Sequence, residues 1–125
     1  MEKNVYDVPG MVKGGPYSTY AEAGGFIFVS GTVPIDMEKN IFITDDIKAG
    51  TELVLTNIKK VLEHAGSSLE KVVKANVYLR DMADFNDMNE VYLKFFPSDF
   101  PARTCVAVKS VPLNLPLEME CIAIK

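Results

Sequence analysis

The chain has 125 residues, of which 48% are hydrophobic and 24% are charged, and its formal net charge is −4. A chain of this length can bury about two thirds of its unfolded surface around one core, so we expect a single domain over residues 1–125, and the apolar share excludes disorder as the main state. The acidic balance disfavours binding to a nucleic-acid backbone, because no basic run is longer than Lys59-Lys60.

The sequence predicts a β-hairpin near the start of the chain. Residues 17–23 and 26–30 have the composition of two strands, and the Gly-Gly pair between them can take the positive φ angles of a tight turn. Both faces of the second strand are apolar, so we expect it to lie inside a sheet that is covered on both sides, and to end at Gly31. A further short strand is expected at 41–43.

A helix is predicted over residues 46–65, where apolar residues recur at helical spacing. Thr44 or Asp45 is expected to cap its beginning and Gly66 to end it. His64 falls in the last turn, where the helix dipole favours a cation, and a structural role is preferred for it over a catalytic one.

The second half of the chain predicts three more strands and a second helix. Residues 72–79 alternate as a half-buried strand whose odd-numbered residues form the apolar face. A helix is expected to begin near Asp84 and to end at Pro97. Residues 102–109 and 117–124 complete the pattern as two strands.

The order of these elements predicts an α+β fold, with both helices on one face of a mixed sheet. The other face would then carry apolar residues with no helix to cover them. Such a surface usually marks an interface between subunits, so we expect a homo-oligomer; apolar surface alone is equally compatible with a dimer or a larger assembly.

The scarcity of histidine and cysteine restricts the chemistry. His64 is the only histidine, which excludes sites that need two, so we expect no metal. Cys105 and Cys121 lie in apolar runs without CxxC spacing, as in reduced cytosolic proteins, although the sequence leaves a disulfide between them open. The first ten residues lack the apolar core of a signal peptide and no apolar run reaches membrane-spanning length, so a cytoplasmic protein is expected.

Two acidic residues stand out in the last predicted strand. Glu118 and Glu120 share a face with Ile122 and Ile124. Carboxylates in an apolar strand need partners or a cavity, because an isolated buried charge is costly. They are either carboxylates at an interface or functional groups, and the sequence does not choose between the two.

Three further polar residues are candidates for a site. Arg103 shares a strand face with Cys105, and its guanidinium could hold a small acid or neutralise Glu118 or Glu120, with the ion pair preferred. The Cys105 thiol is more simply explained as inert and buried, because the only histidine is on a distant helix. Asn89 either caps a loop or faces a cavity.

Several motifs together resemble one family. They are Gly15-Pro16-Tyr17-Ser18, Phe28-Val29-Ser30-Gly31, Val77-Tyr78-Leu79, Asn89-Glu90-Val91-Tyr92, Phe100-Pro101-Ala102-Arg103 and Glu118-Met119-Glu120. Over nearly the whole chain these residues resemble the RidA (YjgF-type) reactive intermediate deaminases. The block from Asn89 through Arg103 to Glu118 is the specific part, whereas the glycine loop alone is a weak signal.

The resemblance implies a chorismate-mutase-like α+β fold with a mixed six-stranded sheet, assembled as a homotrimer with a central barrel and active sites in clefts between subunits. It also implies a 2-iminobutanoate/2-iminopropanoate deaminase. Such an enzyme hydrolyses enamines and imines from amino-acid dehydratases, such as 2-aminoacrylate, to 2-oxo acids and ammonia without metal or cofactor.

The same resemblance assigns roles to individual residues. Arg103 would bind the substrate carboxylate, and Glu118 would position or activate the attacking water. The residues expected to line or brace the pocket are Tyr17, Ser30, Gly31, Asn89 and Cys105. The chemistry agrees with these roles, since a forked cation fixes a small acid and a nearby carboxylate can exchange protons with water or an imine nitrogen.

Some positions depart from the family pattern, and two other functions remain open. Thr19-Tyr20, Gly50, Leu53 and the loop 36–40 differ from the usual residues, which affects the substrate range more than the reaction class. One alternative is a non-enzymatic metabolite-binding or regulatory trimer that uses the same cleft. The other is an RNA-directed activity, which the acidic charge, the absence of tryptophan and the single histidine disfavour.

Overall fold

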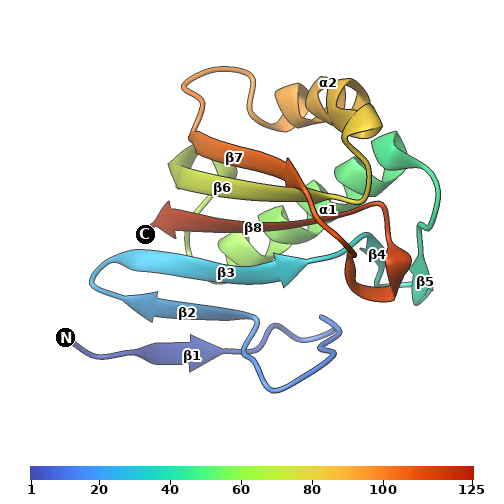
Figure 1. The fold of residues 1–125 in the computed structure, drawn as a ribbon. Helices are drawn as coiled ribbons and strands as arrows, with labels where there is room; N and C mark the ends of the chain where they lie inside the picture. The colour runs from blue at the N-terminus through green and yellow to red at the C-terminus, as the bar shows by residue number, and fades with distance from the viewer.

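Eight strands and two α-helices make up the computed structural model, which describes residues 1–125 (Figure 1). In chain order they are β1 (Asn4–Tyr6), β2 (Tyr20–Ala23), β3 (Phe26–Thr32), β4 (Ile35–Asp36), β5 (Ile41–Phe42), α1 (Ile47–His64), β6 (Val72–Leu79), α2 (Phe85–Phe95), β7 (Ala102–Ala107) and β8 (Leu117–Ile124). None of the helices is long and apolar enough to span a membrane.

Six strands form one mixed sheet in the order β1-β2-β3-β8-β6-β7. The β6–β7 pair is parallel and the other pairs are antiparallel, while β4 and β5 form a separate hairpin. The predicted α+β class and the mixed six-stranded sheet are therefore confirmed. Strand β1 was not predicted from the sequence, because its three residues are all exposed and too few to show a period.

The predicted hairpin forms, with shifted ends. Gly24 and Gly25 connect β2 to β3 with φ angles of 58° and 83°, which side chains with a Cβ rarely adopt. Strand β2 begins at Tyr20 instead of residue 17, and β3 continues through Gly31 to Thr32 instead of ending at Gly31. Strand β3 reaches Thr32 because this residue still pairs with Met119 of β8, and the segment before Tyr20 lines a cavity described below.

The beginning of α1 differs from the prediction by one or two residues. The cap is Asp46, whose carboxylate accepts a hydrogen bond from the Ala49 backbone N–H at 3.0 Å, and not Thr44 or Asp45. The first backbone N–H groups of a helix have no carbonyl acceptor within the helix. The side chain of the cap residue supplies an acceptor for one of them. The predicted stop at Gly66 is confirmed, since this glycine has φ +78° just after the helix.

The cap assignment gives a stability prediction. Replacing Asp46 with Ala is expected to lower the free energy of unfolding by about 1 kcal/mol, because one backbone donor of α1 loses its acceptor. Asp45→Ala is the matched control, since the Asp45 side chain is 91% exposed and lies 3.7 Å from Arg80 Nη2. An exposed pair of this kind is worth about 0–1 kcal/mol. Urea unfolding of both variants checks the assignment, and a larger loss in Asp45→Ala would contradict it.

Gly50 lies inside α1 although glycine is a poor helix former. A Cβ at this position would lie 3.2 Å from Leu117 Cδ2 and 3.4 Å from Pro116 Cγ, so the helix approaches β8 closely at this point. The glycine is thus explained by the packing of α1 against the sheet.

The core lies between the two helices and one face of the sheet. In Figure 1, α1 lies behind the sheet and α2 lies beyond the β7 edge in this view. Side chains of both helices join the same core cluster as one face of the sheet, as the sequence predicted. The helical side chains that are almost fully buried are Val54, Leu55, Ile58, Val61, Leu62 and Met88, and those of the sheet are Ile27, Val29, Val77, Leu79, Leu117 and Met119. At about 25 cal/mol per Å² of apolar surface, burial of these side chains is the main stabilising contribution.

The alternation predicted for β6 breaks at its first residues. Val72 is buried and Val73 is 41% exposed, because the register against β8 shifts between Val72 and Lys74. The placement of Val73 on the apolar face was therefore wrong, whereas Ala75, Val77 and the residues after them follow the prediction. A bulge adds one residue to a strand and inverts the faces on its two sides.

The second face of the sheet, which we call the open face, is not covered within the chain. Phe26 and Phe28, on the face of β3 that points away from the helices, are each 43% exposed, and Val5, Val106 and Ile124 are also exposed. The prediction that both faces of β3 are covered is thus wrong for the isolated chain. The open face remains an uncovered apolar surface, and such a surface usually marks contact with another protein.

Candidate functional site

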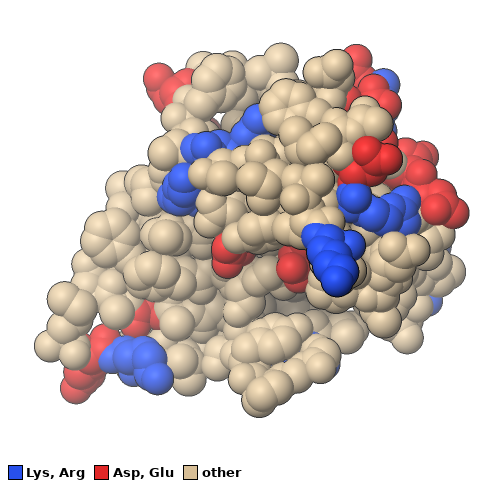
Figure 2. All heavy atoms as spheres, viewed as in Figure 1, with Lys and Arg blue, Asp and Glu red and all other residues tan.

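A cavity of about 770 Å³ lies at one end of the open face. Its wall comes from residues 11–19, the second half of β3, the ends of β6 and β8, and the turn at Pro112 and Leu113. Figure 2 views the same face and shows that most charged groups lie toward its rim, while two acidic groups stand near its middle beside a crevice. The cavity therefore combines apolar walls with a few polar groups, as is usual for small-molecule sites.

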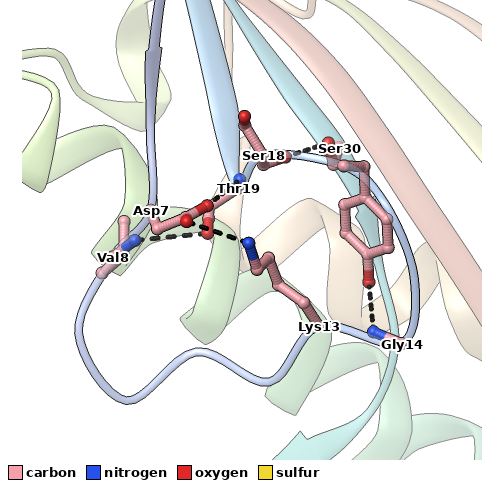
Figure 3. Close-up of polar contacts among 8 residues, drawn as sticks. Asp7, Val8, Lys13, Gly14, Ser18, Thr19 and Ser30 are labelled. Carbon is pink, nitrogen blue, oxygen red and sulfur yellow. Dashed lines mark hydrogen bonds and ion pairs between the residues drawn. The ribbon is translucent and has the colours of Figure 1, made fainter.

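The segment that precedes β2 is held over the cavity by polar contacts (Figure 3). The Asp7 carboxylate accepts hydrogen bonds from the Thr19 backbone N–H at 3.2 Å and from Lys13 Nζ at 2.9 Å. The Val8 backbone N–H donates to Thr19 Oγ1 at 3.2 Å. The Lys13 ammonium and the backbone N–H hold the pKa of Asp7 below its usual value, so these contacts persist at neutral pH.

Two of the predicted pocket residues, Tyr17 and Ser30, lie in this wall. The Gly14 backbone N–H donates to the Tyr17 hydroxyl at 3.1 Å, which fixes the ring beside the cavity. Ser30 Oγ donates to the Ser18 backbone carbonyl at 2.7 Å and ties β3 to the same segment. The sequence analysis gave no account of these bonds.

The two acidic side chains of β8, Glu118 and Glu120, both line the cavity, as their shared strand face predicted. The Tyr78 hydroxyl donates to Glu120 Oε1, and Asn76 Nδ2 donates to the same oxygen at 3.3 Å. Burial, and secondarily the nearby charge of Glu120, raise the pKa of Glu118 above its usual value. Glu118 is thus the acid of this site that is poised to exchange a proton closer to neutral pH.

Gly31 lies against the Glu118 carboxylate. A Cβ built on Gly31 would lie 2.8 Å from Glu118 Oε2 and 2.9 Å from Cδ, closer than side-chain carbons approach. The absence of a side chain at residue 31 therefore leaves room for the carboxylate in its observed position. This is a steric requirement, since no positive φ is involved.

Arg103 lies on the other side of the sheet. Its register partner on β6 is Ala75, which is buried on the helix-covered face. The Arg103 Nη1 donates to Asn89 Oδ1 at 2.7 Å, and the guanidinium carbon lies 4.7 Å from the centre of the Tyr92 ring. A guanidinium over an aromatic ring is held by a cation–π contact, and it keeps its remaining N–H groups available for an acid.

The structure thus divides the predicted site residues into two groups. The first group lines the cavity on the open face and consists of Tyr17, Ser30, Gly31 and Glu118. The second group lies between β7 and α2, where Arg103 contacts Asn89, and the half-buried Cys105 shares the strand face of Arg103. Within one chain Arg103 makes no ion pair, so it does not neutralise Glu118 or Glu120. Neither alternative for Asn89 is seen within one chain, since its side chain accepts a hydrogen bond from Arg103 and does not line this cavity.

The remaining titratable candidates have structural surroundings. Burial raises the pKa of the Cys105 thiol and that of Cys121, the latter to about 12, and both cysteines are free. His64 Nδ1 lies 2.9 Å from the Tyr20 hydroxyl, which ties the end of α1 to β2 and agrees with the structural role predicted for it. No cluster of three His, Cys, Asp or Glu side chains is arranged to hold a metal ion.

The sequence analysis missed Asn76, Tyr78 and Asp7 as parts of the site. The signal for the first two was available, because the alternation of β6 places them on the same face as each other, opposite its apolar residues. Which strand lies beside them could not be known without the sheet order, in which β6 neighbours β8. The fold and the cavity together define a small α+β protein with an acid-lined pocket at the edge of an uncovered apolar sheet.

Comparison with known proteins places the chain in a family. The family model described as Endoribonuclease L-PSP matches residues 11–125. A RutC family protein of Pyrococcus abyssi is 50% identical over 111 residues, which are 89% of this chain and 87% of that protein. Reactive Intermediate Deaminase A, chloroplastic, of Arabidopsis thaliana is 39% identical over 109 residues, 87% of this chain and 58% of that protein.

Solved structures agree with this placement. The crystal structure of E. coli TdcF with bound serine has a TM-score of 0.88 and 31% sequence identity, and the match covers 98% of both chains. The protein belongs to the Endoribonuclease L-PSP family, that of the YjgF/RidA proteins, and the family predicted from the sequence is confirmed.

Proposed function

We propose that this protein is an imine and enamine deaminase, which hydrolyses 2-aminoacrylate and imines of the 2-iminopropanoate and 2-iminobutanoate class to 2-oxo acids and ammonia. The observation that carries the proposal is the Glu118 carboxylate, whose pKa is raised and which stands in a cavity beside Ser30 and Gly31. A relative is named a reactive intermediate deaminase, and a similar structure holds serine, a small molecule with an α-carboxylate. The proposed enzyme needs no metal or cofactor and works in the cytoplasm.

The proposed active site is shared between two protomers. Arg103 and Glu118 lie on opposite faces of one sheet, so a single protomer cannot present both to one small substrate. The uncovered apolar residues of the open face support a homotrimer, with a central barrel of sheets and Arg103 of a neighbouring protomer completing each cavity. Asn89 and Cys105 would come with that Arg103, since Asn89 orients it and Cys105 shares its strand face.

The proposed reaction begins with the substrate carboxylate on the guanidinium of Arg103, which offers two parallel donors. As water adds to the carbon of the protonated imine, its oxygen forms the new C–O bond, Glu118 accepts the water proton, and the C=N π pair moves to nitrogen. Glu118 then returns the proton to nitrogen. The C–N bond breaks, its electron pair leaves with ammonia, and the hydroxyl oxygen forms the carbonyl as its proton passes to water.

A trapping assay tests the proposal. An amino-acid oxidase or a serine/threonine dehydratase generates imines while semicarbazide competes for them, and semicarbazone absorbance is followed. The protein is expected to lower semicarbazone formation in proportion to its concentration, and free 2-oxo acid should rise by the same amount. Total ammonia should stay constant, because semicarbazide and water each release one ammonia from the imine. A chain with no effect on imines from any of several amino acids would contradict the deaminase proposal.

A second candidate function is a non-enzymatic metabolite-binding trimer that uses the same cleft, which the serine held by E. coli TdcF favours. It predicts saturable binding of a small amino or oxo acid without turnover, measurable by calorimetry. An RNA-directed activity, which the description of the family suggests, is not proposed, because the cavity presents the acidic Glu118 and Glu120 and the net charge is −4.

A further inference from the structure

Four polar side chains form a block where β6 neighbours β8. In the antiparallel register Tyr78 pairs with Glu118, and Asn76 pairs with Glu120. The hydrogen bonds do not follow these pairs: both Tyr78 and Asn76 donate to Oε1 of Glu120. Glu118 accepts no hydrogen bond from either of them, and its carboxylate lies against the bare backbone of Gly31. The two carboxylates therefore have different surroundings although they are two residues apart.

This asymmetry separates the roles of the two acids. Two donors from one strand hold the Glu120 carboxylate in one orientation. The contact with Glu120 and burial raise the pKa of Tyr78 to about 12, so its hydroxyl remains a donor throughout the neutral range. Two carboxylates in one cavity disfavour each other's charge, and the one without donors is the one that takes up the proton.

We propose that Tyr78, with Asn76, is a positioning residue that holds the Glu120 carboxylate in one orientation beside Glu118 and thereby confines proton exchange in the active site to Glu118. The inference rests on the proposed function and names the residues that control which carboxylate of the proposed active site exchanges a proton. Neither Tyr78 nor Glu120 needs to touch the substrate for this role, because each acts through the charge and the orientation of the neighbouring acid.

Other charged and titratable groups face this block from every element packed around it. Lys13 and Tyr17, from the segment before β2, line the same cavity, and Lys3, near β1, borders an adjoining surface pocket that reaches Glu120. Lys13 is engaged by Asp7 at 2.9 Å. In the proposed trimer, Arg103 of a neighbouring protomer would also face Glu118. All of these groups remain unchanged in the variants used below, so a difference between variants reports the Tyr78–Glu120 contact.

The test compares Tyr78→Phe with Glu120→Gln. The reaction uses ionised Glu118 as a base, so the rate falls at low pH as Glu118 is protonated. Glu120→Gln removes the nearby negative charge, and the acid limb of the profile of kcat/KM against pH should move to lower pH. Tyr78→Phe lets Glu120 compete for the proton, so less of it resides on Glu118 at a given pH, and the acid limb should again move to lower pH, by less than in Glu120→Gln. In Tyr78→Phe, kcat near neutral pH should also fall on the order of tenfold with KM little changed.

Controls separate this proposal from a structural effect and from the proposed function. Tyr6→Phe removes the hydroxyl of an exposed tyrosine on β1 that stacks on Tyr20, and its profile should match the unsubstituted protein. Carboxyl ¹³C NMR titration of Glu118 needs no substrate and should show the same shifts to lower pH in both variants, even if the chain proves to have no deaminase activity. A shift of the Glu118 titration to higher pH in Tyr78→Phe, or uniform loss of activity with no movement of the NMR titration, would overturn the proposal.

Discussion

Arg103→Ala is expected to reduce imine hydrolysis by about 100-fold or more, mainly through loss of substrate positioning. The variant removes the only forked cation among the site residues, and with it the proposed anchor for the substrate carboxylate. Arg103→Lys should recover little activity, because an ammonium cannot offer two parallel donors to a carboxylate. The trapping assay measures both variants across a range of amino acids.

The control for this prediction is Lys74→Ala, which removes a cation from the neighbouring strand β6 where Lys74 Nζ donates to Thr104 Oγ1 at 3.1 Å. Its activity should remain near that of the unsubstituted protein. Arg103→Ala should also lower the free energy of unfolding by about 1–2 kcal/mol, since the bond to Asn89 and the contact with the Tyr92 ring are lost. Full activity in a folded, assembled Arg103→Ala protein would disprove the anchor.

Gly31→Ala is expected to remove most activity, on the order of 100-fold, with only a small loss of stability. The new Cβ would lie 2.8 Å from Glu118 Oε2, and the flexible end of Glu118 can move away from it without disturbing the fold. The moved carboxylate would no longer hold water in line with the imine carbon. Steady-state kinetics and thermal unfolding of the variant measure the two effects separately.

Gly14→Ala is the matched control for Gly31→Ala. Gly14 lines the same cavity, and a Cβ on it would have nothing within 4 Å. It also keeps the backbone N–H that donates to Tyr17. Activity should therefore persist in Gly14→Ala. Equal losses in the two variants would contradict the prediction, because they would show that any added side chain in the cavity wall lowers activity, whether or not it displaces the Glu118 carboxylate.

The elements of this fold were largely predictable because their periods are long and clear. The stripes of α1 and α2 and the alternation of β8 specify both the element and its buried face. The cap at Asp46 and the bulge after Val72 were not predictable in position, because three acceptors in a row (44–46) can each cap a helix and a bulge leaves no mark on local hydropathy.

The arrangement of the candidate site could not be predicted from the sequence. Strand alternation placed Glu118 with Glu120 and Arg103 with Cys105, and both pairs share a face as expected. Alternation does not say which face of β7 matches which face of β8, because β6 lies between them and its register is set by tertiary packing. The separation of Arg103 from Glu118 therefore required the three-dimensional structure.

The most direct test of a site shared between protomers is subunit mixing. Arg103→Ala and Glu118→Gln chains, each with a different tag, are unfolded together, refolded and assayed for imine hydrolysis, with mixed assemblies isolated through both tags. Each parent should be almost inactive. A cyclic trimer that contains both kinds of chain has an intact Arg103 beside an intact Glu118 of its neighbour at about a third of its interfaces. Recovery of about a third of the activity is therefore expected in the isolated mixed assemblies, whereas mixed assemblies as inactive as their parents would contradict the shared site.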